Sequence, residues 1–191
     1  MVDQTFKPTV QQIASIVGCP LSNVEKYWPL IEADLEKQGI ANWSTRIAVI
    51  ATIGTEVSQF CPINEIGGTS YFTSMYEGRK DLGNTQPGDG AKFHGRGFVQ
   101  LTGRANYAKY GAKIGIPLLE NPELALEPGP ASAILVAFIK DHGIPQHAAT
   151  GDWKGVRRLV NGGLNGWTRF IGLVDKLVNL ARSSATAPKL T

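Results

Sequence analysis

The chain has 191 residues, of which 42% are hydrophobic and 18% charged, and its formal net charge is +3. This length and composition indicate one domain with a proper hydrophobic core, and they exclude a disordered chain or a small disulfide scaffold. The mild positive charge suits an approach to an acidic polymer such as a bacterial wall, but it is too small to indicate nucleic acid. Apolar runs stay far below the roughly 20 residues of a membrane-spanning helix, so we expect no membrane insertion.

Helical periodicity predicts three helices in the first third of the chain. A capping box of Thr9 with Gln12 and another of Ser22 with Glu25 predict the starts of the first two. The third is predicted to follow Ser44 and to run to about residue 57. We assign residues 1–42 to the N-terminal helical part of the domain.

Residues 61–102 lose this periodicity. Glycine, proline, asparagine and aspartate dominate there, so only short strands are expected. A long irregular segment inside a compact domain is normally functional, and we expect this one to form one wall of a substrate cleft. Periodicity returns in helices predicted over residues 130–142, 153–160 and 168–182, and residues 183–191 have the composition of a linker-like tail. The sequence therefore predicts a mainly α domain over residues 1–182.

Three glutamates are candidates for acid–base chemistry. Glu56 lies near the end of an otherwise apolar predicted helix, where a partly desolvated carboxylate keeps its proton more easily, as a general acid in glycoside cleavage must. Glu65 and Glu77 lie in the irregular segment, which could deliver the second carboxylate that inverting glycosidases use to activate water. Each of the three could instead be an ordinary surface charge.

The most informative stretch covers residues 88–107. The stretch has no glycine at the third position of a dinucleotide fingerprint and no lysine at the position of a phosphate loop, so a phosphate-binding loop is excluded. What remains is close-packed backbone followed by amides and hydroxyls that can hydrogen-bond sugar hydroxyls and N-acetyl groups. These side chains belong to Gln100, Thr102, Asn106 and Tyr107.

Residues 95–103, with Asn106 and Tyr107 close behind, resemble the core motif of glycoside hydrolase family 19, which comprises plant-type chitinases and bacteriophage endolysins. Residues 53–56 look like the helix that carries the family's acid, and residues 159–163 look like its Asn-Gly-Gly turn. Arg169 looks like its late arginine. The segments most similar to the phage endolysin branch are residues 62–65, 76–79 and 82–85.

The resemblance, which spans residues 44–182, implies an α+β lysozyme-like fold in which Glu56 is the general acid. Glu77 matches the chitinase base by its spacing, and we favour it, while Glu65 matches an acid of the phage members. By the same resemblance Gln100, Thr102 and Asn106 orient substrate or water, and Asn161 and Arg169 support the cleft. The sequence departs from the family where the usual histidine before the acid is Thr55, and where Val57 and Ser58 replace small residues.

The function implied is that of an endolysin that cleaves β-1,4 glycosidic bonds of peptidoglycan with inversion, as a monomer and without a cofactor or metal. The N-terminus has no signal-peptide pattern, so we expect synthesis in the host cytoplasm and holin-dependent release. The alternatives are a chitinase, a lytic transglycosylase, a wall-binding module and an amidase that uses Cys61 with His94. His142 and His147 lack the spacing of a zinc motif.

Overall fold

A computed structural model describes residues 5–186, which form a mainly helical protein with very little sheet, as predicted. The described chain divides into two compact units. The first comprises residues 5–60 and 138–186, and the second comprises residues 61–137. None of the described helices combines the length and apolar composition that crossing a membrane requires.

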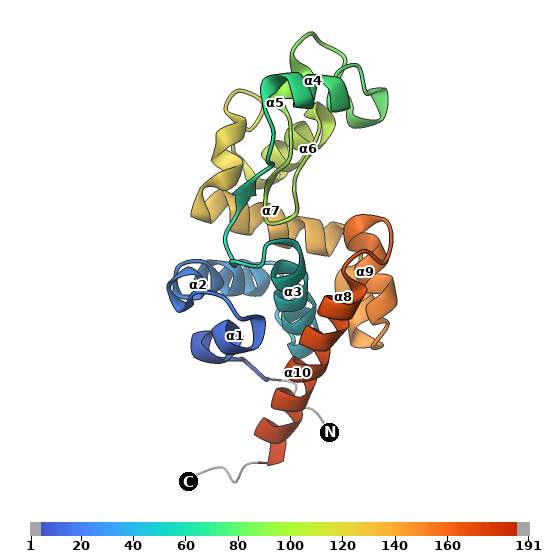
Figure 1. The fold of residues 1–191 in the computed structure, drawn as a ribbon. Helices are drawn as coiled ribbons and strands as arrows, with labels where there is room; N and C mark the ends of the chain where they lie inside the picture. The colour runs from blue at the N-terminus through green and yellow to red at the C-terminus, as the bar shows by residue number, and fades with distance from the viewer. Residues whose placement is uncertain (1–4, 187–191) are drawn as a thin grey trace. The chain divides into compact units, whose positions relative to one another are not determined.

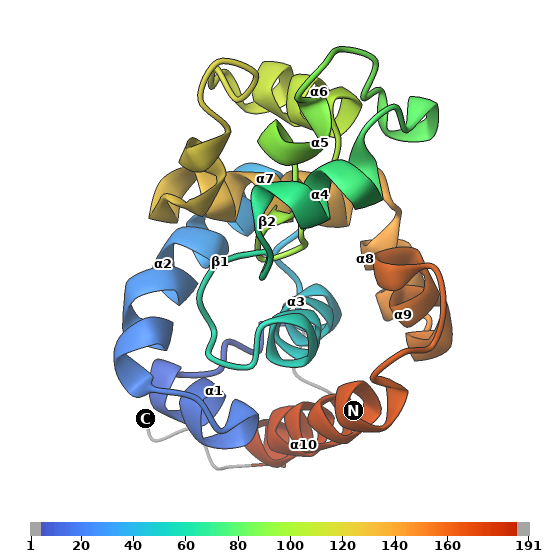
Figure 2. The same ribbon diagram turned by 45° about the horizontal axis from the view of Figure 1, so that its top comes forward.

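The first unit is built around one buried helix. This helix is α3 (Trp43–Glu56), and every residue from 44 to 54 in it is buried. Figure 2 shows α3 with the other helices of the unit around it, and α1, α8, α9 and α10 contact it directly. These neighbours, with α2, have the bounds α1 (Val10–Val17), α2 (Leu21–Lys37), α8 (Ile144–Ala149), α9 (Trp153–Asn161) and α10 (Trp167–Thr186).

The capping prediction is confirmed for the first helix and wrong for the second. Thr9 and Gln12 form a complete capping box at the start of α1. No such box starts α2, because Pro20 is the N-cap residue and Ser22 already lies in the first turn. The side chain of proline has no hydrogen-bond acceptor, so α2 starts without a side-chain cap. The cap of α3 is Asn42 rather than Ser44, and its side chain accepts from the amide of residue 45.

The second unit contains more helix than its sequence predicts. The expected irregular segment includes two short helices, α4 (Thr69–Tyr76) and α5 (Asp89–Lys92), and a 3₁₀ turn η1 (Lys80–Leu82). Its sheet is one antiparallel pair, β1 (Ile63–Asn64) with β2 (Arg96–Gly97). The remaining elements, shown in Figure 1, are α6 (Arg104–Ile114), η2 (Pro122–Leu126) and the first part of α7 (Pro128–Asp141), which continues into the first unit.

Helices near the C-terminus differ from their predicted bounds by a few residues. The predicted helix over residues 130–142 is α7, which starts two residues earlier. Asp152 caps α9 as expected, through a 2.9 Å hydrogen bond from the amide of Gly155. The last helix, α10, runs to Thr186 and so extends into the predicted tail, and residues 187–191 lie outside the described residues.

Candidate active site

The predicted acid, Glu56, is the last residue of α3, and 24% of its side chain is exposed. Its Oε1 atom accepts a hydrogen bond from Nη1 of Arg157, a residue of α9 whose side chain is only 3% exposed. A charge-assisted contact with a buried guanidinium is among the stronger side-chain interactions in proteins. The carboxylate is therefore held at the helix end, in contact with one fixed cation.

The guanidinium of Arg157 has a second anchor. Its Nε donates to the main-chain carbonyl of Asn165 at 2.6 Å, and the side-chain amide of Asn161 donates to the same carbonyl at 3.0 Å. Asn161 also accepts from the amide of Gly163, which closes the turn after α9. The turn that Asn161 closes thus presents the carbonyl that orients Arg157, and the support of a cleft by Asn161 stays a prediction.

Arg169 links α10 to the helix that carries the acid. Its Nε donates to the carbonyl of Gly54 at 2.6 Å, and its Nη2 donates to the carbonyl of Val17 at 3.1 Å. Carbonyls in the last turn of a helix lack helical partners, and a cationic side chain satisfies them well. Arg169 therefore fixes the backbone two residues before Glu56.

In the second unit, Glu65 accepts hydrogen bonds at both carboxylate oxygens. Tyr76 donates its hydroxyl to Oε1 at 2.7 Å, and the amide of Gly95 donates to Oε2 at 2.8 Å. Partial burial together with this hydrogen bond raises the pKa of Tyr76 to about 12, so its hydroxyl remains a donor at neutral pH. The two contacts together fix the orientation of the Glu65 carboxylate.

Glu77 is bound in a similar way by main-chain groups. The amide of Gly88 donates to Oε1 and that of Gly90 to Oε2, each at 2.7 Å. Glu77 follows the last residue of α4, and these bonds join it to the start of α5. The carboxylates of Glu65 and Glu77 are thus held in place as hydrogen-bond acceptors, and both retain lone pairs with which to bind a water molecule.

The predicted sugar-binding amides and hydroxyls lie around the turn that follows β2. Gln100 has a φ of +49°, unusual for a residue other than glycine, and its side chain donates to the carbonyls of Ile63 and Gly97. Thr102 donates to the carbonyl of Gln100, and Asn106 donates to the carbonyl of Thr102. Strained backbone held by several hydrogen bonds is common at functional sites.

The contacts around Gly95 show how closely this group is packed. A methyl group added at Gly95 would lie 2.8 Å from Oε1 of Gln100, 3.0 Å from Oε2 of Glu65 and 3.3 Å from Oγ1 of Thr102. The glycine therefore lets three polar side chains of the predicted site converge on one point of the backbone.

Tyr107 does not have the predicted role in substrate binding. Its side chain is completely buried, its hydroxyl donates to the carbonyl of His94, and it accepts from Nη1 of Arg96. Burial raises the pKa of Tyr107 to about 12. Its hydroxyl is thus directed at protein groups inside the second unit, and the motif uses this tyrosine for packing.

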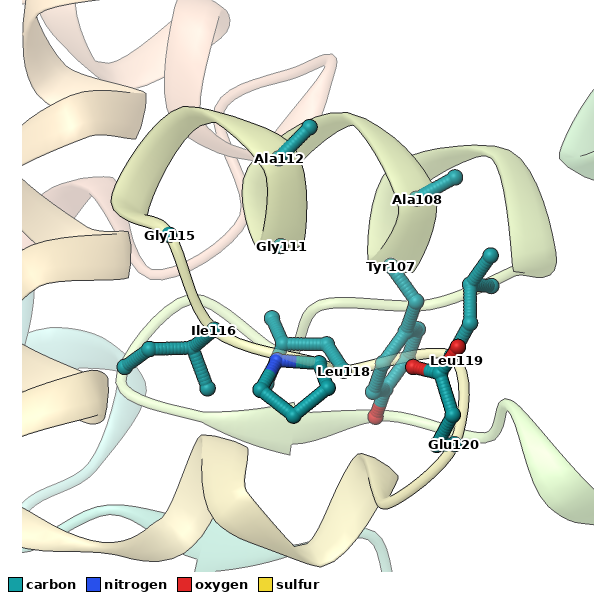
Figure 3. Close-up of a pocket in the computed structure, with 10 residues that line it drawn as sticks. Tyr107, Ala108, Gly111, Ala112, Gly115, Ile116, Leu118, Leu119 and Glu120 are labelled. Atoms are coloured by element: carbon teal, nitrogen blue, oxygen red, sulfur yellow. The ribbon is translucent and has the colours of Figure 1, made fainter.

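A cavity of about 430 Å³ in the second unit is lined in part by Tyr107 (Figure 3). It is lined by α6 and by residues 115–120, and Glu120 is the carboxylate that it offers. Glycosidases of the expected type need a pair of carboxylates, so this cavity does not match their chemistry.

His94, the partner that the amidase alternative needs, is held by other groups of the second unit. Nδ1 of His94 lies 2.7 Å from the carbonyl of Ala91, and Nε2 lies 2.8 Å from Oδ1 of Asn64. The ring also stacks on Phe72, so it is already engaged on both nitrogens and one face. Over the described part of the chain, histidine, cysteine and carboxylate side chains form no group of three that could hold a metal ion.

Two residues of the site were missed by the sequence analysis, Arg157 and Tyr76. Arg157 lies one helical turn before Asn161, so the two share a face of α9, and this spacing is a signal that the sequence offers. Tyr76 lies directly before Glu77, yet it contacts Glu65, eleven residues earlier. That contact depends on how α4 folds back and has no local signal.

Comparison with known proteins agrees with this description. No family model matches the chain. A glycosyl hydrolase family 19 domain-containing protein of Haemophilus influenzae is 26% identical over 170 residues, which cover 75% of this chain and 83% of that protein.

Solved structures with the same fold are family 19 chitinases. A bacterial family 19 chitinase superposes with a TM-score of 0.64 at 18% identity, covering 88% of this chain and 94% of its own. Chitinase C from Streptomyces griseus superposes with a TM-score of 0.61 at 15% identity, covering 91% and 76%. The chain is thus similar in sequence to a family 19 domain protein, and it shares the fold of family 19 chitinases.

Proposed function

We propose that this glycoside hydrolase is a peptidoglycan hydrolase of the phage endolysin type, which cleaves β-1,4 bonds between amino sugars with inversion. The observation that carries the proposal is the carboxylate of Glu56, fixed at the end of the buried helix α3 by a buried guanidinium. The net charge of +3 favours the approach to an acidic cell wall. The protein acts as a monomer, and its partner is the polysaccharide itself.

The proposed reaction needs two carboxyl groups in different protonation states. Glu56 gives its proton to the leaving glycosidic oxygen, and a carboxylate of the second unit takes a proton from the attacking water. We assign this second role to Glu77, with Glu65 as the alternative. Both carboxylates are held in a fixed orientation by hydrogen-bond donors, which a general base that positions a water molecule requires.

A chitinase is the second candidate, and it is favoured by the two structures that share the fold, both of which are described as chitinases. The two polymers differ mainly in the lactyl-peptide branch of peptidoglycan. Gln100, Thr102 and Asn106 offer amides and a hydroxyl, groups that suit N-acetylated sugars in either polymer.

Mass spectrometry of the fragments released from purified peptidoglycan and from chitin oligomers tests the proposal. We expect muropeptides with ordinary reducing ends, and none when Glu56 is replaced by glutamine. Cleavage of chitin oligomers alone would show the chitinase instead. Anhydro ends would show a transglycosylase, and free stem peptides on intact glycan would show an amidase.

We further propose that the enzyme is made in the host cytoplasm and reaches the wall after holin-dependent release. Expression in a susceptible host with and without a holin tests this. Lysis should require both proteins, and rapid lysis by the enzyme alone would contradict it.

A further inference from the structure

We propose that Arg157 is a positioning residue for the acid Glu56, which it orients and whose negative charge it stabilises as the proton leaves. The inference rests on the proposed glycosidase function. It concerns a residue outside the motifs that identify the family, on a helix that follows the acid by about a hundred positions in the chain.

The burial of Arg157 is the first argument. A guanidinium that is 3% exposed has lost nearly all of its hydration, a large cost unless every side of the group finds a partner. Here Nη1 donates to Glu56, Nε donates to the carbonyl of Asn165 at 2.6 Å, and the ring of Phe170 lies 6.0 Å from the guanidinium carbon. The group is thus fixed in direction, with one arm toward the carboxylate.

The backbone around the guanidinium is shaped to keep it there. Gly166 has a φ of +73°, and a methyl group added to it would lie 3.3 Å from Nη2 of Arg157 and 2.8 Å from Cγ2 of Thr55. Thr55 is itself held, because its hydroxyl donates to the carbonyl of Ala51. The glycine therefore allows the turn before α10 to approach both the arginine and the residue next to the acid.

The neighbouring cation Arg169 of α10 has a different role. It donates to the main-chain carbonyls of Gly54 and Val17, whereas Arg157 of α9 contacts the Glu56 carboxylate itself.

The chemical consequence concerns the transition state. As Glu56 transfers its proton to the glycosidic oxygen, its neutral carboxyl becomes a carboxylate, and a preorganised cation stabilises that charge as it develops. The contact strengthens during the reaction and does not touch the substrate. Its loss should therefore lower kcat and leave KM little changed.

The division between kcat and KM separates this role from a merely structural one. A residue that only supported the fold would lower the folded fraction or the melting temperature, and its loss would not lower kcat selectively in the folded protein.

The test compares R157M and R157K with R158M, using cleavage of peptidoglycan or of a chitin hexasaccharide, whichever the wild type cleaves. Arg158 is the neighbouring, exposed residue of the same helix, so R158M removes the same charge without the contact. We expect kcat to fall about 10²-fold in folded R157M, with KM little changed. R157K keeps the charge, so it should restore part of kcat, and R158M should behave as wild type.

The inference is overturned if folded R157M keeps the wild-type kcat, or if it loses activity only through a higher KM. Should R157M fail to fold, R157K decides: a wild-type kcat there overturns the orienting role, because an ammonium cannot reproduce both contacts of the guanidinium. If the wild type cleaves and E56Q does not, the proposed function stands whatever the Arg157 variants do. If the wild type cleaves neither glycan, the function and the inference fail together.

Discussion

Replacing Gly166 with alanine should destabilise the protein through two separable effects. The first is backbone strain, since a φ of +73° costs an ordinary residue about 1–2 kcal/mol. The second is crowding, because the new methyl group would lie 2.8 Å from Cγ2 of Thr55 and 3.3 Å from Nη2 of Arg157. Overpacking of this kind costs about 1–3 kcal/mol, so the expected total is about 2–5 kcal/mol.

Gly151 provides the matched control. It has the same φ of +73°, and a methyl group there would meet nothing within 4 Å. Urea denaturation of G166A, G151A and wild type gives the free energy of unfolding of each. We expect G151A to lose only the strain contribution and G166A to lose about 1–3 kcal/mol more. Equal losses in the two variants would refute the claim that the turn before α10 is packed against Arg157 and Thr55.

Three further variants test other parts of the structure. D89N should lose about 3 kcal/mol of stability at pH 7, because Arg104 holds the pKa of Asp89 below its ordinary value of 3.8. This stabilisation is present above pH 3.8 and disappears as the pH falls through the lower pKa of the folded state, so the unfolding curves of D89N and wild type should differ at neutral pH and converge at acid pH. Y107F should lose about 1–3 kcal/mol with KM unchanged, and a large rise in KM would show that its buried hydroxyl reaches substrate after all. E77Q should lower the initial rate about 10²–10⁴-fold and E65Q much less, with melting temperatures as the folding check; the reverse order would make Glu65 the base.

The terminal helices could be predicted from the sequence because their signals are local. The capping box at Thr9 and the Asp152 cap each depend on residues three positions apart, and the structure contains both. The box at Ser22 failed because Pro20, two residues earlier, starts the helix by its own geometry. Local rules are therefore reliable until two of them compete within one turn.

The helices of the second unit were harder to predict because their apolar faces are small. α6 buries Tyr107, Tyr110 and Gly111, a face on which a glycine and two partly polar rings replace the usual aliphatic residues. That pattern is weak as a helical period, yet the face packs well. The same composition led to a sugar-binding role for Tyr107, which its complete burial does not support.

In the candidate site, too, residues with a local sequence signal could be predicted, and residues that depend on tertiary contacts could not. The acid and its helix could be predicted from the motif, whereas its partner Arg157 depends on contact between α3 and α9, which are distant in sequence. Glu65 and Glu77 were both identified as carboxylates, but the donors that hold them come from backbone far along the chain, at Gly95 and at Gly88. Tertiary contacts of this kind leave no local periodicity to read.

The central claim is that Glu56 acts as the general acid in glycan cleavage. Its most direct test is the rate at which new reducing ends appear when wild type and E56Q act on the same purified peptidoglycan. Glutamine keeps the shape and an oxygen that accepts from Arg157, so the variant should fold and melt near the wild-type temperature. We predict a rate at least about 10²-fold lower. A folded E56Q protein that releases reducing ends at the wild-type rate would contradict the account.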